Sequence, residues 1–186
     1  MNNLRTVSEP RYDTKTVIIA ALMAAITCIG TMIIKVPTPT NGYIHPGDGF
    51  VLLSGLLLGP FWGALAAGIG SGLSDLISGY TVYAPATFAI KGLTALAAYY
   101  VFKLLTKVIG SEKKAPALIV SGIAGEVVMV TGYFFFEIFL LAVLNQSSLA
   151  AGAIAATAGI LPNIVQGAFG VIISVLLYPI LLKAIR

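Results

Sequence analysis

Polar side chains recur at helical spacing inside stretches of this 186-residue chain that are otherwise apolar. Glu126, Tyr133 and Glu137 are seven and four residues apart, which would place two carboxyl groups and a phenol on one face of a helix. Asn163 and Gln166 would share a face of another helix. An ionisable group inside a membrane costs about 2.5–3.5 kcal/mol on insertion scales, so such residues are candidates for function. Desolvated carboxylates favour a small ligand with amino, amidine or ring N–H donors over an anion.

Further candidates lie in two polar segments, "PTPTNGYIHPGD" (37–48) and "GYTVYAP" (79–85). Tyrosines in these segments could stack on a planar ligand, and a pocket with aromatic walls and a few polar groups is the usual form of a small-molecule site. The predicted ligand-binding residues are Asn41, Tyr43, His45, Asp48, Asp75, Tyr80, Tyr83, Thr87, Lys91, Tyr133, Glu137, Asn163 and Gln166. Glu126 is a further candidate, either as a ligand contact or as a protonated carboxyl group bonded to a neighbouring helix.

Pairing between helices is the alternative interpretation of these polar residues, and Asp75 with Lys91 is the pair that it predicts. The carboxyl groups of Asp48, Asp75, Glu126 and Glu137 outnumber the one lysine, Lys91, among them. Pairing alone therefore does not account for the whole set.

The composition is that of a membrane protein. Hydrophobic residues make up 58% of the chain and charged residues 10%, against roughly 25% charged in a soluble domain, and the mean hydropathy is +0.97. The single cysteine, Cys28, and the single histidine exclude a disulfide framework and a thiolate metal cluster within one chain. We predict no metal, no cofactor and no enzymatic activity, because no nucleophile stands in a pattern with a base.

The predicted fold is an all-α membrane protein with six transmembrane helices in a single integral membrane domain, residues 1–186. Spans of about 20 apolar residues cross a hydrocarbon core of ~30 Å. The predicted spans are 14–34, 47–58, 61–78, 86–105, 115–144 and 162–183. Gly59 and Pro60 predict a tight turn between the second and third spans. Pro162 predicts the start of the sixth, which leaves 146–161 as a connector with at most a short helix.

The positions of lysine and arginine predict the orientation. With both termini in the cytoplasm, every lysine and arginine except Lys35 and Lys91 lies on the cytoplasmic side, in or next to the N-terminal tail (1–13), the basic loop (106–115) and the C-terminus. The net charge of +4 is therefore a topology signal, and no nucleic-acid partner is predicted because a soluble basic face is absent. The polar loop 36–47 would lie outside the cell.

Small residues on the first span form two pairs at helical spacing, Ala20 with Ala24 and Ala21 with Ala25. Such faces allow close helix packing in lipid. They would serve either packing within the chain or docking onto another membrane subunit.

The order of spans and several motifs resemble the substrate-binding S component of energy-coupling factor (ECF) vitamin transporters. The motifs are the polar segment 37–48, "GLLLGPFWG" (55–63), "GSGLSDLISGYTVYAPATFAIKGL" (70–93) and, less strongly, "PNIVQG" (162–167). The resemblance implies a subunit of a prokaryotic plasma membrane that captures a vitamin from outside and works with a transmembrane T subunit and two ATPases. It also implies that loop 36–47 is a lid and that Ala20, Ala21, Ala24 and Ala25 dock onto the T subunit.

The chain has no "GxxxxGK[ST]" phosphate-binding loop, so ATP hydrolysis by that route would occur on partner subunits. We expect a small heterocyclic ligand, with a hydroxymethylpyrimidine or a pyridoxine-like vitamin favoured and riboflavin as an alternative. The competing function is a secondary transporter or channel that needs no ATPase, for which internal inverted repeats would be expected. No convincing repeat is found.

Overall fold

The computed structural model describes residues 14–110 and 114–185. Five helices make up most of this part: α1 (Thr14–Ile33), α2 (Asp48–Ile77), α3 (Ala84–Ile109), α4 (Lys114–Leu144) and α5 (Leu149–Ile185). All five are long and apolar enough to cross a membrane. The prediction of an α-helical membrane protein is therefore confirmed. The predicted tail 1–13 and part of the basic loop 106–115 lie outside the described residues.

Helix α2 turns sharply at Gly59, whose φ of 80° is a conformation that a side chain would disfavour. Pro60 follows directly, as the sequence predicts for the start of a new helical arm. The two arms lie against each other: a β-carbon placed on Gly63 would be 2.4 Å from the carbonyl oxygen of Ser54. The predicted second and third spans thus correspond to the arms 48–58 and 60–77 of α2, and the other predicted spans to the remaining four helices.

Helix α5 differs from its predicted bounds. It begins at Leu149 and continues through Pro162, so the prediction that Pro162 starts the helix and that 146–161 is a connector is wrong. Residues 149–161 are alanine, glycine and aliphatic residues apart from Thr157, and a segment of that composition satisfies its backbone in lipid by remaining helical. Neighbouring helices let transmembrane helices tolerate an internal proline.

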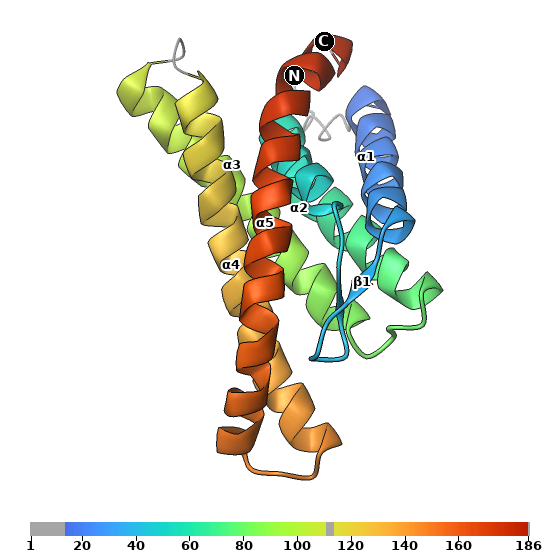
Figure 1. Cartoon of the computed structure of the whole chain (residues 1–186). Coiled ribbons are helices and arrows are strands. Elements are labelled where there is room, and N and C mark those ends of the chain that lie inside the picture. The colour runs from blue at the N-terminus through green and yellow to red at the C-terminus, as the bar shows by residue number, and fades with distance from the viewer. Residues whose placement is uncertain (1–13, 111–113, 186) are drawn as a thin grey trace, which may run out of the picture.

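The loop after α1 folds into a short antiparallel hairpin of β1 (Val36–Pro37) and β2 (Tyr43–Ile44). Val36 pairs with Ile44 and Pro37 with Tyr43, and Asn41 at the tip has a φ of 63°. We call residues 36–47 the lid hairpin. It lies beside the lower half of the bundle, on the same side as α1 (Figure 1).

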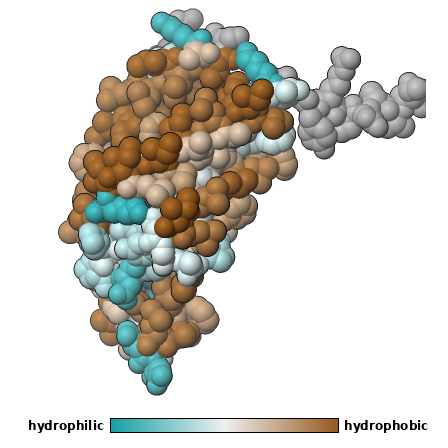
Figure 2. Space-filling view, turned by 90° about the vertical axis from the view of Figure 1, so that its right-hand side faces the viewer, coloured by the Kyte–Doolittle hydropathy of each residue, from teal (hydrophilic) through white to brown (hydrophobic). Residues whose placement is uncertain are grey.

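The helices pack around α2, which contacts α1, α3 and α5, while α4 fills the space between α3 and α5. The main apolar core joins Met23 of α1, Leu52 and Leu53 of α2, Ala98 of α3 and Tyr178 of α5. Outside this core, apolar side chains cover much of the surface, and more polar side chains gather toward one end (Figure 2). This is the surface expected of a protein that lies in lipid.

The two ends of the bundle differ. The start of α1, the end of α3, the start of α4 and the end of α5 lie at one end, and the α4–α5 turn lies at the opposite end, with the lid hairpin in the half next to it (Figure 1). Which end faces the cytoplasm stays a prediction from the lysine and arginine pattern.

Candidate ligand-binding site

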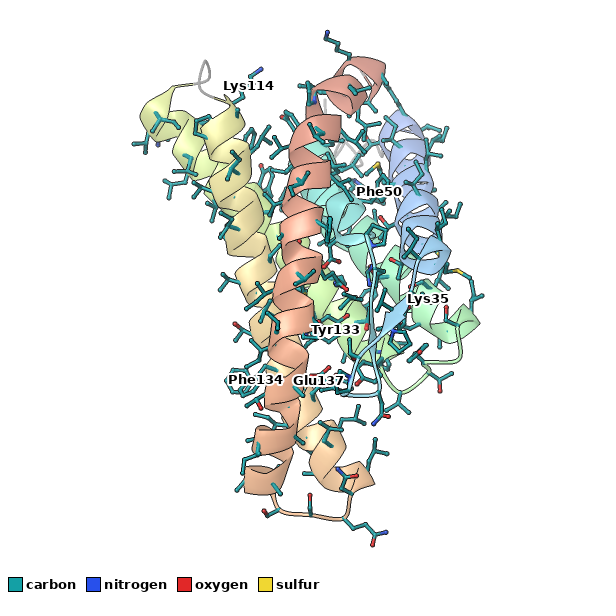
Figure 3. The ribbon with its side chains drawn as sticks, in the orientation of Figure 1. Lys35, Phe50, Lys114, Tyr133, Phe134 and Glu137 are labelled. Carbon is teal, nitrogen blue, oxygen red and sulfur yellow. The ribbon has the colours of Figure 1, made fainter. Side chains whose placement is uncertain are left out.

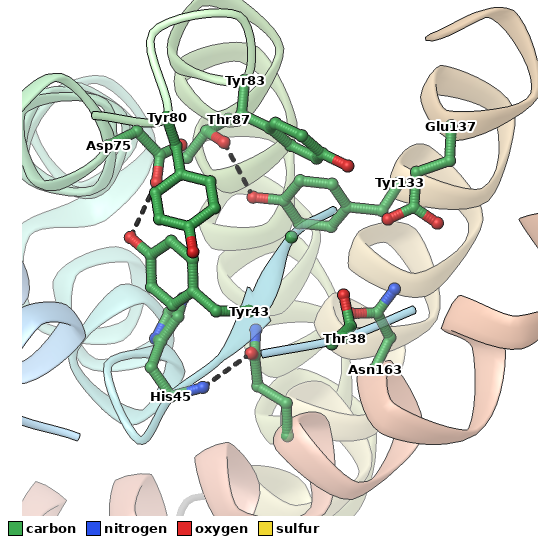
Figure 4. Close-up of a pocket in the computed structure, with 12 residues that line it drawn as sticks. Thr38, Tyr43, His45, Asp75, Tyr80, Tyr83, Thr87, Tyr133, Glu137 and Asn163 are labelled. Atoms are coloured by element: carbon green, nitrogen blue, oxygen red, sulfur yellow. Dashed lines mark hydrogen bonds between the residues drawn. The ribbon is translucent and has the colours of Figure 1, made fainter. Parts of the chain in front are cut away.

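A small pocket of about 30 Å³ lies beneath the lid hairpin, between the halves of α2, α3, α4 and α5 on that side (Figure 4). Sites that hold drug-sized molecules measure about 300–1,000 Å³, so this pocket would have to widen to hold a vitamin. Most of the predicted ligand-binding residues line it: Tyr43, His45, Asp75, Tyr80, Tyr83, Thr87, Tyr133, Glu137, Asn163 and Gln166. Thr38 and Gly42 of the lid hairpin also line it and are not among the predicted residues.

Helical spacing explains how α4 contributes to the pocket. Tyr133 and Glu137 are four residues apart and both point toward the space under the lid hairpin, whereas the neighbouring Phe134 points away from it (Figure 3). The Tyr133 hydroxyl lies 3.0 Å from the Thr87 hydroxyl on α3. The predicted polar faces of α3 and α4 therefore meet at the pocket.

Tyr43 joins the lid hairpin to α2. Its hydroxyl donates a 2.8 Å hydrogen bond to the carboxylate of Asp75, and its ring packs against that of Tyr80 with centroids 4.6 Å apart. On its other side Lys35 lies 5.2 Å from the ring centroid and donates a hydrogen bond to Ser78. Two of the pocket's tyrosines and one of its carboxylates therefore also hold the lid hairpin in place.

Thr40 makes a second connection, to Tyr83 directly before α3 and to α4. Its hydroxyl donates a 2.8 Å hydrogen bond to Oε1 of Glu137, and its carbonyl oxygen accepts a 2.5 Å hydrogen bond from the Tyr83 hydroxyl. Thr40 is 1% exposed although it belongs to a surface hairpin. Thr40 is not among the predicted residues, because a threonine in a Pro-rich loop has no sequence pattern that signals burial.

A third connection runs from the base of the lid hairpin into the membrane-embedded core. The backbone N–H of His45 donates to Oε1 of Gln166 at 2.9 Å, and the Gln166 amide donates to Asp48 at 2.7 Å. Asp48 in turn pairs with Lys91 at 2.5 Å, and neither side chain is exposed. The predicted Asp75–Lys91 pair is therefore wrong, since the lysine on α3 reaches the start of α2 instead.

Three residues predicted to bind a ligand do not line the pocket. Asn41 is exposed at the tip of the lid hairpin, and its positive φ accounts for an asparagine there. Asp48 and Lys91 neutralise each other below the pocket. The turn at Asn41 and the ion pair of Asp48 with Lys91 therefore explain these three residue types without a ligand.

Glu126 also lies outside the pocket. Both its carboxyl oxygens are buried, without a hydrogen-bond partner among the described residues. A β-carbon placed on Gly170 of α5 would be 2.9 Å from both Oε1 of Glu126 and Cβ of Asp48, so the glycine allows the two acidic side chains to approach each other. The alternative of a carboxyl group that interacts within the bundle fits this position better than a ligand contact.

Comparison with known proteins identifies the family. A sequence model described as "ECF-type riboflavin transporter, S component" matches residues 11–184. The chain belongs to this family of S components. The resemblance predicted from the sequence motifs is thereby confirmed, and the protein is a vitamin-binding subunit of a transporter and a multi-pass protein of the cell membrane.

One curated protein and one solved structure are also similar to this chain. The S component is 33% identical over 106 residues to an uncharacterized protein of Pyrococcus woesei, a match that covers 56% of this chain and 66% of that protein, just under two thirds of its length. A solved structure, "Structure and mechanism of the S component of a bacterial ECF transporter", aligns with a TM-score of 0.66 at 24% identity, over 92% of this chain and 98% of that chain. At this identity the alignment shows that the two share a fold.

Burial changes the acid–base properties of the lid hairpin of this S component. Burial lowers the pKa of His45 to about 3, partly opposed by the charge of Asp48, so the imidazole is neutral at physiological pH. Its Nδ1 accepts a 3.1 Å hydrogen bond from the backbone N–H of Gly47, which only an unprotonated nitrogen can do. Burial, with Asp75 adding to it, raises the pKa of Tyr43, which stays a hydrogen-bond donor.

The two alanine pairs of α1 have different surroundings. Ala20 is buried in the main core and Ala24 is half-buried, whereas Ala21 and Ala25 are exposed. All four border an apolar groove between α1 and the second arm of α2. Packing within the chain therefore accounts for Ala20, and the exposed pair of this S component remains available to another protein.

Proposed function

We propose that this S component captures riboflavin, or a closely related planar vitamin, from outside the cell in the pocket under the lid hairpin. The observation that carries the proposal is that residues lining the pocket also hold the lid hairpin closed, through Tyr43 with Asp75 and Thr40 with Glu137. Opening and closing of the hairpin would then control access to the pocket. Riboflavin is placed ahead of a hydroxymethylpyrimidine or pyridoxine-like ligand because of the family to which the chain belongs.

The pocket suits a neutral, planar, hydrogen-bonding ligand. Tyr43, Tyr80, Tyr83 and Tyr133 offer ring faces and edges for stacking. Asp75 and Glu137 supply hydrogen-bond acceptors, and the described residues that line the pocket include no lysine or arginine. With His45 neutral as well, nothing in the lining would compensate a phosphate group. The free vitamin is therefore the expected ligand, ahead of its phosphate ester.

The proposal includes partners. A transmembrane T subunit would dock on the exposed face of Ala21 and Ala25, where small side chains permit close helix packing, and two cytoplasmic ATPases would supply the energy. The lid hairpin would face outward and both termini the cytoplasm, with the chain forming one integral membrane domain. Lipid would cover the remaining apolar surface.

Ligand titration of the purified protein tests the proposal. In detergent and without nucleotide, we expect one riboflavin per chain to bind with a sub-micromolar Kd, measured by quenching of flavin fluorescence. Hydroxymethylpyrimidine, pyridoxine and thiamin serve as competitors, and a Tyr83→Leu variant, which removes one ring from the pocket, should bind more weakly. Binding of a competitor in place of riboflavin would reassign the ligand, and binding of none of the panel would refute the proposal.

A further inference from the structure

We propose that Glu137 recognises a hydrogen-bond donor on the bound vitamin and connects that recognition to closure of the lid hairpin through Thr40. This inference rests on the proposed function and assigns a specific role within the same pocket. It makes Glu137, together with Asn163, a subsite for one kind of chemical group. That group donates a hydrogen bond to a carboxyl oxygen and accepts one from an amide.

The two oxygens of Glu137 have different surroundings. Oε1 accepts the hydrogen bond from Thr40, whereas Oε2 is buried and has no partner among the described residues. The whole residue is only 3% exposed and lines the pocket. A buried acceptor without a partner costs about 1–3 kcal/mol, so a ligand group that donates to Oε2 would recover that energy.

Asn163 faces the same part of the pocket from α5. Its side chain and that of Glu137 lie on one side of the pocket beside Thr38, away from Asp75 and Tyr43 (Figure 4). Asn163 is 8% exposed, and its amide makes no hydrogen bond to another described residue. The amide can donate and accept. An acceptor and an amide, both without partners, fit a hydroxyl group or a ring N–H next to a carbonyl, and riboflavin has both.

Thr40 links this subsite to the lid hairpin. A carboxyl group held on one oxygen by Thr40 and on the other by the ligand would be fixed in one rotamer by both partners. When one partner has already ordered the Glu137 side chain, the other binds it with a smaller entropic cost. Binding of the vitamin would therefore favour the closed lid hairpin. Thr40 itself would not contact the ligand.

The test measures how the effect of Glu137→Gln depends on the ligand. Gln keeps the shape but has an NH2 donor in place of one carboxyl oxygen, so either Thr40 or the ligand would face a donor instead of an acceptor. Three probes are titrated: riboflavin, lumiflavin, which lacks the hydroxyl chain, and N3-methylriboflavin, which lacks the ring N–H. Glu126→Gln is the matched control, because that carboxyl group is buried on the same helix but lies outside the pocket.

We expect Glu137→Gln to weaken riboflavin binding about ten- to a hundredfold, the range for a buried hydrogen-bonding group that is left without a partner. The loss should disappear for one of the two analogues, which identifies the ligand group at the subsite. Thr40→Val should increase the riboflavin dissociation rate and reduce the difference in affinity between riboflavin and that analogue, because the ligand alone then has to order Glu137. Glu126→Gln should bind all three like the wild type.

Two outcomes would overturn the proposal in distinguishable ways. If the wild type binds riboflavin and Glu137→Gln weakens all three flavins equally, Glu137 is a structural residue and only this inference fails. If the wild type binds none of the flavins, the proposed function fails and the inference fails with it.

Discussion

Asp48 and Lys91 form an ion pair at 2.5 Å inside the helix bundle, with neither side chain exposed to the surface. The second oxygen of Asp48 accepts a hydrogen bond from Gln166, and the Lys91 ammonium lies 5.2 Å from the centroid of the Tyr133 ring. The pair thus joins the start of α2 to α3, directly below the pocket. It neutralises two charges that would be costly alone in a membrane.

Replacement of one partner should be far more damaging than replacement of both. Asp48→Asn leaves the Lys91 charge buried and unpaired, which we expect to lower the free energy of unfolding by roughly 3–5 kcal/mol. The double variant Asp48→Asn with Lys91→Met removes the charge as well and should recover most of that loss. Equilibrium unfolding in mixed micelles measures both. Equal destabilisation by the single and double variants would show that the unpaired charge of Lys91 does not cause the loss in free energy of unfolding.

Tyr43→Phe tests the closed lid hairpin. The variant keeps the ring against Tyr80 but loses the 2.8 Å hydrogen bond to Asp75, so the hairpin should open more often. We expect riboflavin to dissociate about ten times faster or more, as measured by stopped-flow fluorescence. Tyr80→Phe is the control, since its ring is retained and no hydrogen bond of its hydroxyl is found in the described structure. An unchanged dissociation rate in Tyr43→Phe would contradict a role of this bond in closure.

Acidification should weaken closure through His45. The closed state lowers the imidazole pKa to about 3, whereas an imidazole exposed by opening would titrate near 6.5. The open state therefore binds more protons below about pH 6.5, and the stability of the closed state is lost as pH falls through that value. Between about pH 7.5 and 5.5 we expect riboflavin affinity to fall roughly tenfold.

His45→Asn isolates this contribution. Asparagine keeps an acceptor near the Gly47 N–H and a backbone N–H for Gln166, but it does not titrate. Titrations of both proteins at several pH values give the difference. A pH dependence that persists unchanged in His45→Asn would assign it to another group.

The sequence selected most of the residues that line the pocket, but it did not predict the contacts among them. Helical spacing selected Tyr133 with Glu137 and Thr87 with Lys91, because residues on one helix face follow from the helical period alone. The partner of Lys91 could not be predicted in the same way, because it depends on how α2 and α3 are rotated about their axes. Asp48 and Asp75 are both plausible by depth, and the packing of the helices decides between them.

Backbone signals had a similar limit. Gly59 and Pro60 correctly predicted a turn, since a positive φ and a missing N–H are local properties. The prediction that Pro162 starts a helix is wrong, because the local sequence does not distinguish a proline that begins a helix from one inside a transmembrane helix. The burial of Thr40 depends on the folded hairpin and on Glu137, 97 residues away in the chain, which no local pattern indicates.

The exposed alanine pair of α1 provides the test of partner docking. Leucine at Ala21 and Ala25 would thicken a face that is exposed in the isolated protein, so riboflavin binding should stay unchanged while uptake into cells that carry the T subunit and ATPases should be abolished. Leucine at Ala20 and Ala24 would instead overpack the α1–α2 contact and lower stability by about 1–3 kcal/mol. Binding is measured in detergent, uptake with labelled riboflavin, and assembly by co-purification with the T subunit. Normal uptake by the Ala21 and Ala25 variant would mean that the T subunit docks on another face.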